Sequence, residues 1–183
     1  LAGRIANIIQ GQGLTLKAAL DTHLHRDHLS ARREIIALIG ADESHQDCDV
    51  LGWPKQQTEL PCGPYRLTKL ATPGHTAEAV TILLRKEQQL CAAFAGDLIL
   101  PGGVGRTDLP GGDMSALADS IRLLAATLED NTLVLSSHDY AQRFFTNWQL
   151  ACQEQPLLAE LIQQQQPPSA WLQQLQQQNA ALA

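Results

Sequence analysis

Seven residues near the start of the chain combine side chains that bind transition metals. The segment THLHRDH, residues 22–28, contains three imidazoles and one carboxylate. In an extended backbone His23 and His25 point to the same side, because side-chain direction repeats every two residues. A following turn can bring Asp27 and His28 to face the same point. Imidazole nitrogen and carboxylate oxygen are ligands that divalent transition metals prefer, so this spacing favours a metal site over a solvated polar loop.

Single ligand-type residues follow three later apolar segments. They are His75 in TPGHT, Asp97 in the pair GD, and His138 in SSHDY. Glycine precedes both His75 and Asp97, and glycine permits backbone conformations and close approaches that other residues resist. Ligand sites in α/β proteins gather where strands end and loops converge on one rim of the sheet. The sequence therefore predicts that these residues meet around a shared metal.

The elements that must position these residues alternate between strands and helices, which indicates an α/β fold. Apolar periodicity predicts helices over residues 1–10, 30–39 and 115–128. Ser30 is the expected N-cap of the second helix. The expected apolar faces are Leu1, Ile5, Ile8 and Ile9 in the first helix and Leu117, Ile121, Leu124 and Leu128 in the third. Short apolar or alternating runs predict strands over residues 14–20, 65–71, 80–84, 90–95 and 132–135. The remainder is expected to be helical, with Phe144, Phe145 and Trp148 as core or helix–helix contacts.

Composition limits the class of protein. The net charge is −6 and the 13 basic residues are scattered, which weighs against a nucleic-acid surface. No apolar run is long enough to span a bilayer, and the first ten residues lack a secretory signal. The four cysteines contain no C-x-x-C pair, which argues against a disulfide framework and makes the cytoplasm the expected compartment. The chain begins at Leu1 and its only methionine is Met114, so we expect a missing N-terminal portion.

These motifs, together with GVGRTDLPGGD at residues 103–113, resemble the ordered motifs of the metallo-β-lactamase superfamily over roughly residues 14–145. The resemblance implies an αββα sandwich with the metal at one edge, here lacking its first strands. We expect an N-terminally incomplete catalytic domain over residues 1–152. A glutamine-rich helical extension is expected over residues 153–183.

Two branches of the superfamily resemble the chain, and both use glutathione-linked substrates. The persulfide dioxygenase branch matches the GVGRTDL loop and the HDY ending at residues 138–140. The hydroxyacylglutathione hydrolase (glyoxalase II) branch carries a similar loop but usually has glycine after the last histidine. We therefore favour a dioxygenase that oxidises a persulfide with O₂ to sulfite and thiol. A third alternative is an impaired relative that binds metal without activity.

The two activities imply different uses of the same ligands. A dioxygenase would hold one Fe(II) with His23, His75 and Asp97, leaving positions open for O₂ and the sulfur substrate. The other ligand-type residues would orient ligands and waters. A hydrolase would hold two zinc or mixed divalent ions, bridged by Asp97, and use the whole set. That set is His23, His25, Asp27, His28, His75, Asp97 and His138.

Further roles follow from the resemblance. Arg106 and Tyr140 are expected to contact the substrate, since the planar fork of Arg106 suits a carboxylate such as that of glutathione. A structural salt bridge from Arg106 to Asp108 or Asp139 is the alternative. Asp27 and Tyr140 are the expected catalytic residues.

The expected binding partners are a small thiol or persulfide and a rhodanese domain or protein. A second copy of the chain, forming a homodimer, is a further expected partner. Binding to nucleic acid or to a membrane is not expected.

Overall fold

The computed structural model describes residues 1–25, 30–40, 47–139, 142–163, 173–174 and 177. The chain divides into two compact units, Leu1–Thr58 and Glu59–Ala183. Within the described residues, no helix has the length and apolarity that crossing a membrane requires. The apolar residues of the C-terminal tail around Trp171 lie outside the described residues.

The first unit contains two helices that contact each other, α1 (Ala2–Gly11) and α2 (Arg32–Ile39). Both were predicted from apolar periodicity. Gly40 ends α2 with φ 63°, in the left-handed region that glycine adopts without strain. The hydroxyl oxygen of Ser30 accepts a hydrogen bond of 3.2 Å from the Arg32 amide, close to the capping role predicted for it.

Two predictions for the first unit are wrong. Residues 14–20 form no strand, and their side chains are exposed or half-buried. An apolar run becomes a strand only where a neighbouring backbone can pair with it, and residues 14–20 have no strand or bridge pairing. The buried residues of α1 are Ala2 and Ala6, whereas Ile8, expected on the buried face, is 56% exposed.

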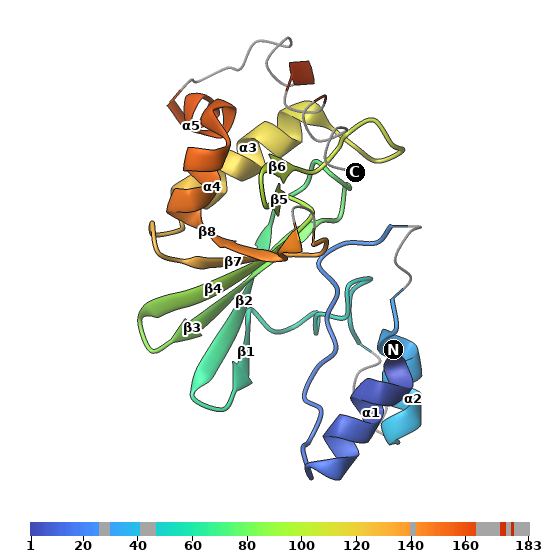
Figure 1. Ribbon diagram of the computed structural model, residues 1–183. Helices are drawn as coiled ribbons and strands as arrows, with labels where there is room; N and C mark the ends of the chain where they lie inside the picture. The colour runs from blue at the N-terminus through green and yellow to red at the C-terminus, as the bar shows by residue number, and fades with distance from the viewer. Residues whose placement is uncertain (26–29, 41–46, 140–141, 164–172, 175–176, 178–183) are drawn as a thin grey trace. The chain divides into compact units, whose positions relative to one another are not determined.

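The second unit is built on a six-stranded sheet with the order β1-β2-β3-β4-β7-β8 (Figure 1). Its strands are β1 (Glu59–Cys62), β2 (Tyr65–Ala71), β3 (Val80–Lys86), β4 (Gln89–Gly96), β7 (Leu133–Ser136) and β8 (Phe145–Asn147). A separate small pair contains β5 (Ile99–Leu100) and β6 (Gly103–Val104). The predictions of β2, β3, β4 and β7 are confirmed. The expectation that the chain is helical throughout its last part is wrong at β8.

Strand direction determines which residues meet at the edge of this sheet. β3 is antiparallel to both β2 and β4, and β7 is parallel to β4. Therefore β2, β4 and β7 all run in the same direction. Their carboxyl ends lie at the same sheet edge, where parallel strands deliver the residues that follow them.

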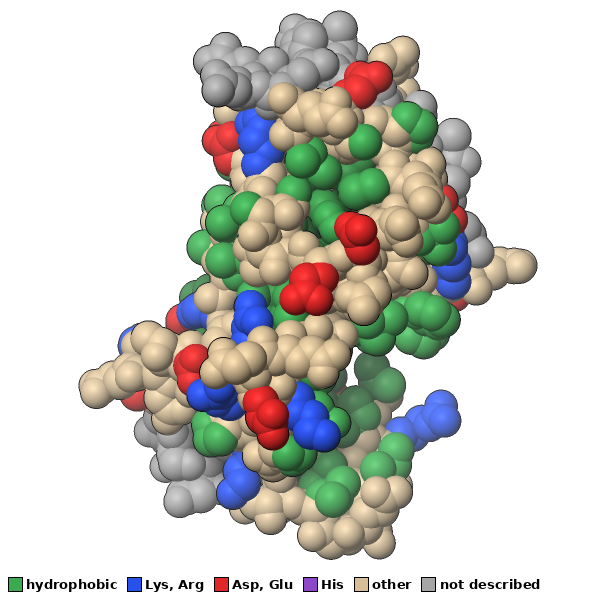
Figure 2. Space-filling model, turned by 90° about the vertical axis from the view of Figure 1, so that its left-hand side faces the viewer, with side chains coloured by type: hydrophobic (Ala, Val, Ile, Leu, Met, Phe, Trp, Pro, Cys, Tyr) green, Lys and Arg blue, Asp and Glu red, His purple; other side chains and the backbone are tan. Residues whose placement is uncertain are grey.

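Charged side chains of both signs are interspersed on the face of the molecule drawn in Figure 2. Acidic and basic groups lie close to one another there, with hydrophobic and uncharged polar surface between them. Binding to a nucleic-acid backbone relies on a concentrated group of Lys and Arg side chains. The described residues on this face do not provide such a group.

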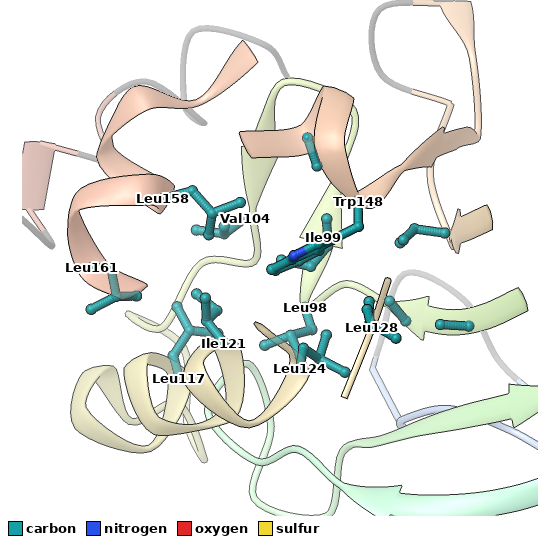
Figure 3. Packing of buried hydrophobic residues seen from close by; sticks show 14 of the residues in the cluster. Leu98, Ile99, Val104, Leu117, Ile121, Leu124, Leu128, Trp148, Leu158 and Leu161 are labelled. Carbon is teal, nitrogen blue, oxygen red and sulfur yellow. The ribbon is translucent and has the colours of Figure 1, made fainter. Parts of the chain in front are cut away.

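Three helices of the second unit cover one face of its sheet: α3 (Met114–Ala125), α4 (Trp148–Glu154) and α5 (Pro156–Gln163) (Figure 1). Leu83, Ala93 and Val134 are register partners on neighbouring strands and face this side. The helices contribute the opposing apolar side chains (Figure 3), and the predicted stripe on α3 is confirmed. The residues of this hydrophobic core that Figure 3 labels are Leu98, Ile99, Val104, Leu117, Ile121, Leu124, Leu128, Trp148, Leu158 and Leu161.

The prediction that three aromatic residues are internal contacts is confirmed only for Trp148, which is 5% exposed. Phe144 and Phe145 are 55% and 51% exposed, so that prediction is wrong for both. In β8, Thr146 pairs with the core residue Val134 and is itself buried. Because side chains alternate along a strand, Phe145 points to the opposite face.

Adjacent leucines on α3 provide a test of this packing. Leu124 is 0% exposed and Leu123 is 41% exposed. We expect Leu124→Ala to lower the free energy of unfolding by about 2–5 kcal/mol, because it leaves a cavity in the core. Leu123→Ala should change it by only about 0.5 kcal/mol, since it lies on the helix surface. Urea unfolding of metal-free protein, followed by circular dichroism, measures both; equal losses would contradict the assigned helix face.

Candidate metal centre

Three of the predicted ligands lie together in the second unit. His75 follows β2, Asp97 directly follows β4 and His138 follows β7, so the shared strand direction brings all three to one sheet edge. Nε2 of His75 lies 3.3 Å from Oδ2 of Asp97. Nε2 of His138 lies at the same distance from the same oxygen. Two imidazoles thus converge on one carboxylate oxygen.

The parallel pairing of β4 and β7 positions His138. Gly96 and Ser136 are register partners, and the Ser137 amide donates a hydrogen bond of 3.1 Å to the Gly96 carbonyl. The Ser136 hydroxyl donates to the His138 carbonyl at 2.9 Å. The two serines before His138 therefore hold its backbone against the end of β4, beside Asp97.

Helix α3 holds the loop that carries His75. The Asp113 amide donates to the Gly74 carbonyl at 2.8 Å, and the buried Ser120 hydroxyl donates to the carbonyl of the preceding proline at 2.6 Å. Gly74 has φ 137°, and a Cβ there would lie 2.4 Å from backbone atoms of Leu117. Glycine is required at this position both for its backbone conformation and for the close approach of the helix.

The hydrogen bonding of His75 determines which of its nitrogens faces the carboxylate. Its Nδ1 lies 2.8 Å from the Arg106 carbonyl oxygen, which can only accept, so Nδ1 carries the proton. In the neutral ring the lone pair is then on Nε2, facing Asp97. An imidazole lone pair and a carboxylate repel each other at this distance unless a proton or a metal cation lies between them. Since His75 and Asp97 are 4% and 6% exposed, water screens this repulsion only weakly.

This arrangement fits a metal ion. Metal-binding histidines commonly donate their second ring N–H to a carbonyl or carboxylate, which fixes the tautomer and the ring orientation. His75 has this bond to the Arg106 carbonyl. His75 and Asp97 also each offer a ligand atom within 4.8 Å of the other. The second unit therefore contains a His/Asp cluster suited to a metal ion.

Arg106 forms the salt bridge that the sequence offered as an alternative to substrate contact. Its Nε and Nη2 donate to the two carboxylate oxygens of Asp108 at 2.7 and 2.6 Å. These hydrogen bonds lower the pKa of Asp108 to about 2, against an ordinary value of 3.8. Contact of Arg106 with a substrate stays a prediction.

The sequence did not identify two residues that shape this centre. A Cβ on Gly105 would lie 2.2 Å from the Asp97 carbonyl oxygen and 3.0 Å from Nδ1 of His75. Glycine there lets the loop approach both residues, and its place beside Arg106 in a glycine-rich loop was the available signal. Asp113 caps α3 by accepting from the Ser115 and Ala116 amides, and an aspartate before a helical run is a recognisable capping signal.

The first unit contains the other described ligand candidates. His23 and His25 have ring centroids 6.2 Å apart and offer ligand atoms within 4.8 Å of each other. Nδ1 of His23 lies 3.1 Å from the Thr22 hydroxyl oxygen, a hydrogen bond whose donor depends on the tautomer. Asp27, His28 and Tyr140 lie outside the described residues, so their assignments stay predictions.

Comparisons with known proteins agree with the fold and the motifs, although no family model matches the chain. The probable metallo-hydrolase YqgX of Bacillus subtilis is 31% identical over 159 residues, which cover 74% of each chain. The mitochondrial persulfide dioxygenase ETHE1 of Mus musculus is 31% identical over 147 residues, covering 76% of this chain and 55% of the relative. The match thus spans about half of that dioxygenase.

Solved structures share the fold. The crystal structure of ETHE1 from Myxococcus xanthus superposes with a TM-score of 0.71 and 28% identity, over 98% of this chain and 83% of that chain. Other structures with this fold are named as metallo-β-lactamases. The α/β architecture, with its mixed sheet and helices, matches theirs. The chain belongs to the metallo-β-lactamase superfamily.

Proposed function

We propose that this chain is a metal-dependent enzyme that uses Fe(II) to oxidise glutathione persulfide or a related small persulfide. The observation that carries the proposal is the approach of Nε2 of His75 to a carboxylate oxygen of Asp97, 3.3 Å away. It occurs in a chain that matches proteins named persulfide dioxygenases over 76% of its length. Two histidines and one carboxylate suit iron enzymes that react with O₂.

Each predicted site residue has a proposed role. His23 joins His75 and Asp97 as ligands of one ferrous ion, which when bound would offer open positions for O₂ and the sulfur substrate. His25, Asp27, His28 and His138 orient the ligands and nearby waters. Asp27 and Tyr140 are the proposed catalytic residues, and Tyr140 is the proposed contact to the substrate. Arg106 is the alternative contact, in competition with its salt bridge to Asp108.

The proposed reaction balances without a further reductant. One persulfide, one O₂ and one water give one thiol, one sulfite and two protons. The outer sulfur of the persulfide loses four electrons, and O₂ gains four. The sulfur–sulfur bond breaks, and the inner sulfur leaves as the thiol. The chain's own residues must therefore hold a small thiol-derived substrate beside the ion and provide a route for protons.

A binuclear hydrolase is the second candidate, because His138 and His75 approach the same oxygen of Asp97. A carboxylate shared by two imidazoles is suited to bridging two ions about 3.5–4 Å apart. The similarity to a protein named as a probable metallo-hydrolase also supports this candidate. Its reaction would add water to a glutathione thioester and release an acid and a thiol.

Metal content and product analysis distinguish the two candidates. Protein loaded anaerobically with Fe(II) and desalted is expected to retain about one iron per chain. It should consume O₂ with glutathione persulfide and form sulfite in equal amount, while leaving lactoylglutathione intact. Retention of two zinc ions with hydrolysis of lactoylglutathione would instead establish the second candidate. Protein that retains neither metal would contradict both.

Single histidine substitutions test the ligand assignment. We expect His75→Ala to abolish metal retention through desalting, since it removes the nitrogen that faces Asp97. His25→Ala should weaken retention only moderately if one ion binds, because it then orients neighbouring groups. His45→Ala is the matched control, since His45 is the histidine outside the predicted set.

Elemental analysis, with metal-free thermal unfolding as a check on folding, gives the readout. An equal loss in His25→Ala and His75→Ala would favour two ions. Full metal occupancy in His75→Ala would show that the proposed centre is in the wrong place.

A further inference from the structure

Arg106 makes two contacts with different groups. Its backbone carbonyl accepts the hydrogen bond of 2.8 Å from Nδ1 of His75. Its guanidinium donates two parallel hydrogen bonds to Asp108, at 2.7 and 2.6 Å. Paired bonds between arginine and a carboxylate are directional as well as strong. Both contacts belong to one residue, so the paired guanidinium and the carbonyl that His75 uses are parts of the same loop.

We propose that Asp108 is a positioning residue for the metal centre, acting through Arg106 on His75. By holding the guanidinium, Asp108 keeps the Arg106 carbonyl where the Nδ1–H of His75 donates to it. His75 then keeps the tautomer and ring orientation that present Nε2 to an ion. This inference rests on the proposed function only in requiring a metal ion at His75. It assigns the fork of Arg106 to Asp108 instead of to the substrate.

The backbone on either side of Arg106 is tightly packed. A Cβ on Gly105 would lie 2.2 Å from the Asp97 carbonyl oxygen, and a Cβ on Gly112 would lie 2.2 Å from the Thr107 carbonyl oxygen. The side chain of Arg106 is 55% exposed, so it is not enclosed by packing in the same way. The Asp108 carboxylate supplies a directional restraint on this exposed side of the loop.

The ionisation of Asp108 keeps this restraint in place at physiological pH. The guanidinium lowers the pKa of Asp108 to about 2. The contribution of a carboxylate with a lowered pKa is complete above its ordinary value of 3.8 and is lost only as the pH falls towards 2. Both side chains are more than half exposed, and exposed pairs contribute little to folding stability. We therefore expect the effect on His75 to exceed the effect on unfolding.

Metal titration without substrate tests the proposal. Asp108→Ala and Arg106→Ala both leave the backbone carbonyl of residue 106 in place. Each should raise the Kd for Zn²⁺, measured by competition with a chromophoric chelator, about tenfold, as expected when a group that orients a metal-binding histidine is lost. Asp119→Ala is the matched control, because it breaks an ion pair with Arg122 (2.8 Å) in the same unit. Its Kd should equal that of the unsubstituted protein.

Exchanging the two charged residues tests whether the ion pair itself maintains the metal affinity. The double variant R106D/D108R re-forms the pair in reverse order and should recover most of the lost affinity. Asp108→Asn, which keeps the shape of the side chain, provides a milder variant if Asp108→Ala fails to fold. The unfolding midpoint of the metal-free protein checks folding in every case. Unchanged Kd in properly folded Asp108→Ala, Asp108→Asn and Arg106→Ala would overturn the inference.

Kinetics separate positioning from substrate contact. With saturating Fe(II), a positioning role predicts that Asp108→Ala and Arg106→Ala lower kcat and leave the KM for glutathione persulfide unchanged. If Arg106 instead binds the substrate carboxylate, the KM for glutathione persulfide should rise in Arg106→Ala, and the metal affinity should not change. That second pattern would overturn the inference but not the proposed function. Failure of the unsubstituted protein to bind metal would overturn the proposed function itself.

Discussion

The candidate metal centre depends on one hydrogen bond, which fixes the orientation of the His75 ring. Its Nδ1–H donates to the Arg106 carbonyl oxygen, so in the neutral ring the lone pair on Nε2 faces the Asp97 carboxylate at 3.3 Å. Two electron-rich atoms held at this distance, with little exposure to water, require a positive centre between them. A proton or a metal ion can supply it, and Nε2 of His138 approaches the same carboxylate oxygen at 3.3 Å.

The fold maintains this arrangement mainly through backbone geometry. Strands β2, β4 and β7 share one direction and deliver the three side chains to one sheet edge. Helix α3 buries Leu117 and Leu124 in the core, and the same helix hydrogen-bonds the His75 loop through Ser120, while its capping residue Asp113 does so from its N-terminus. Packing of the core and placement of a candidate ligand therefore depend on the same helix.

Sequence patterns predicted the parts that depend on local signals. Alternation identified β2, apolar runs identified β3, β4 and β7, and the polar residues after these strands were the ones the sheet brings together. Residues 14–20 were misassigned, because an apolar run does not reveal whether a partner strand is present. β8 is too short for alternation to show. The bond from His75 to the Arg106 carbonyl spans 31 residues and uses a backbone atom, so no residue type could indicate it.

Diffraction at the iron absorption edge tests the central claim most directly. Crystals grown anaerobically with Fe(II) should give an anomalous peak about 2 Å from Nε2 of His75 and from a carboxylate oxygen of Asp97, the usual length of such bonds. Nδ1 of His75 should still donate to the Arg106 carbonyl. A map without a peak there, with His75 and Asp97 joined through a shared proton at the distance found without metal, would contradict the account.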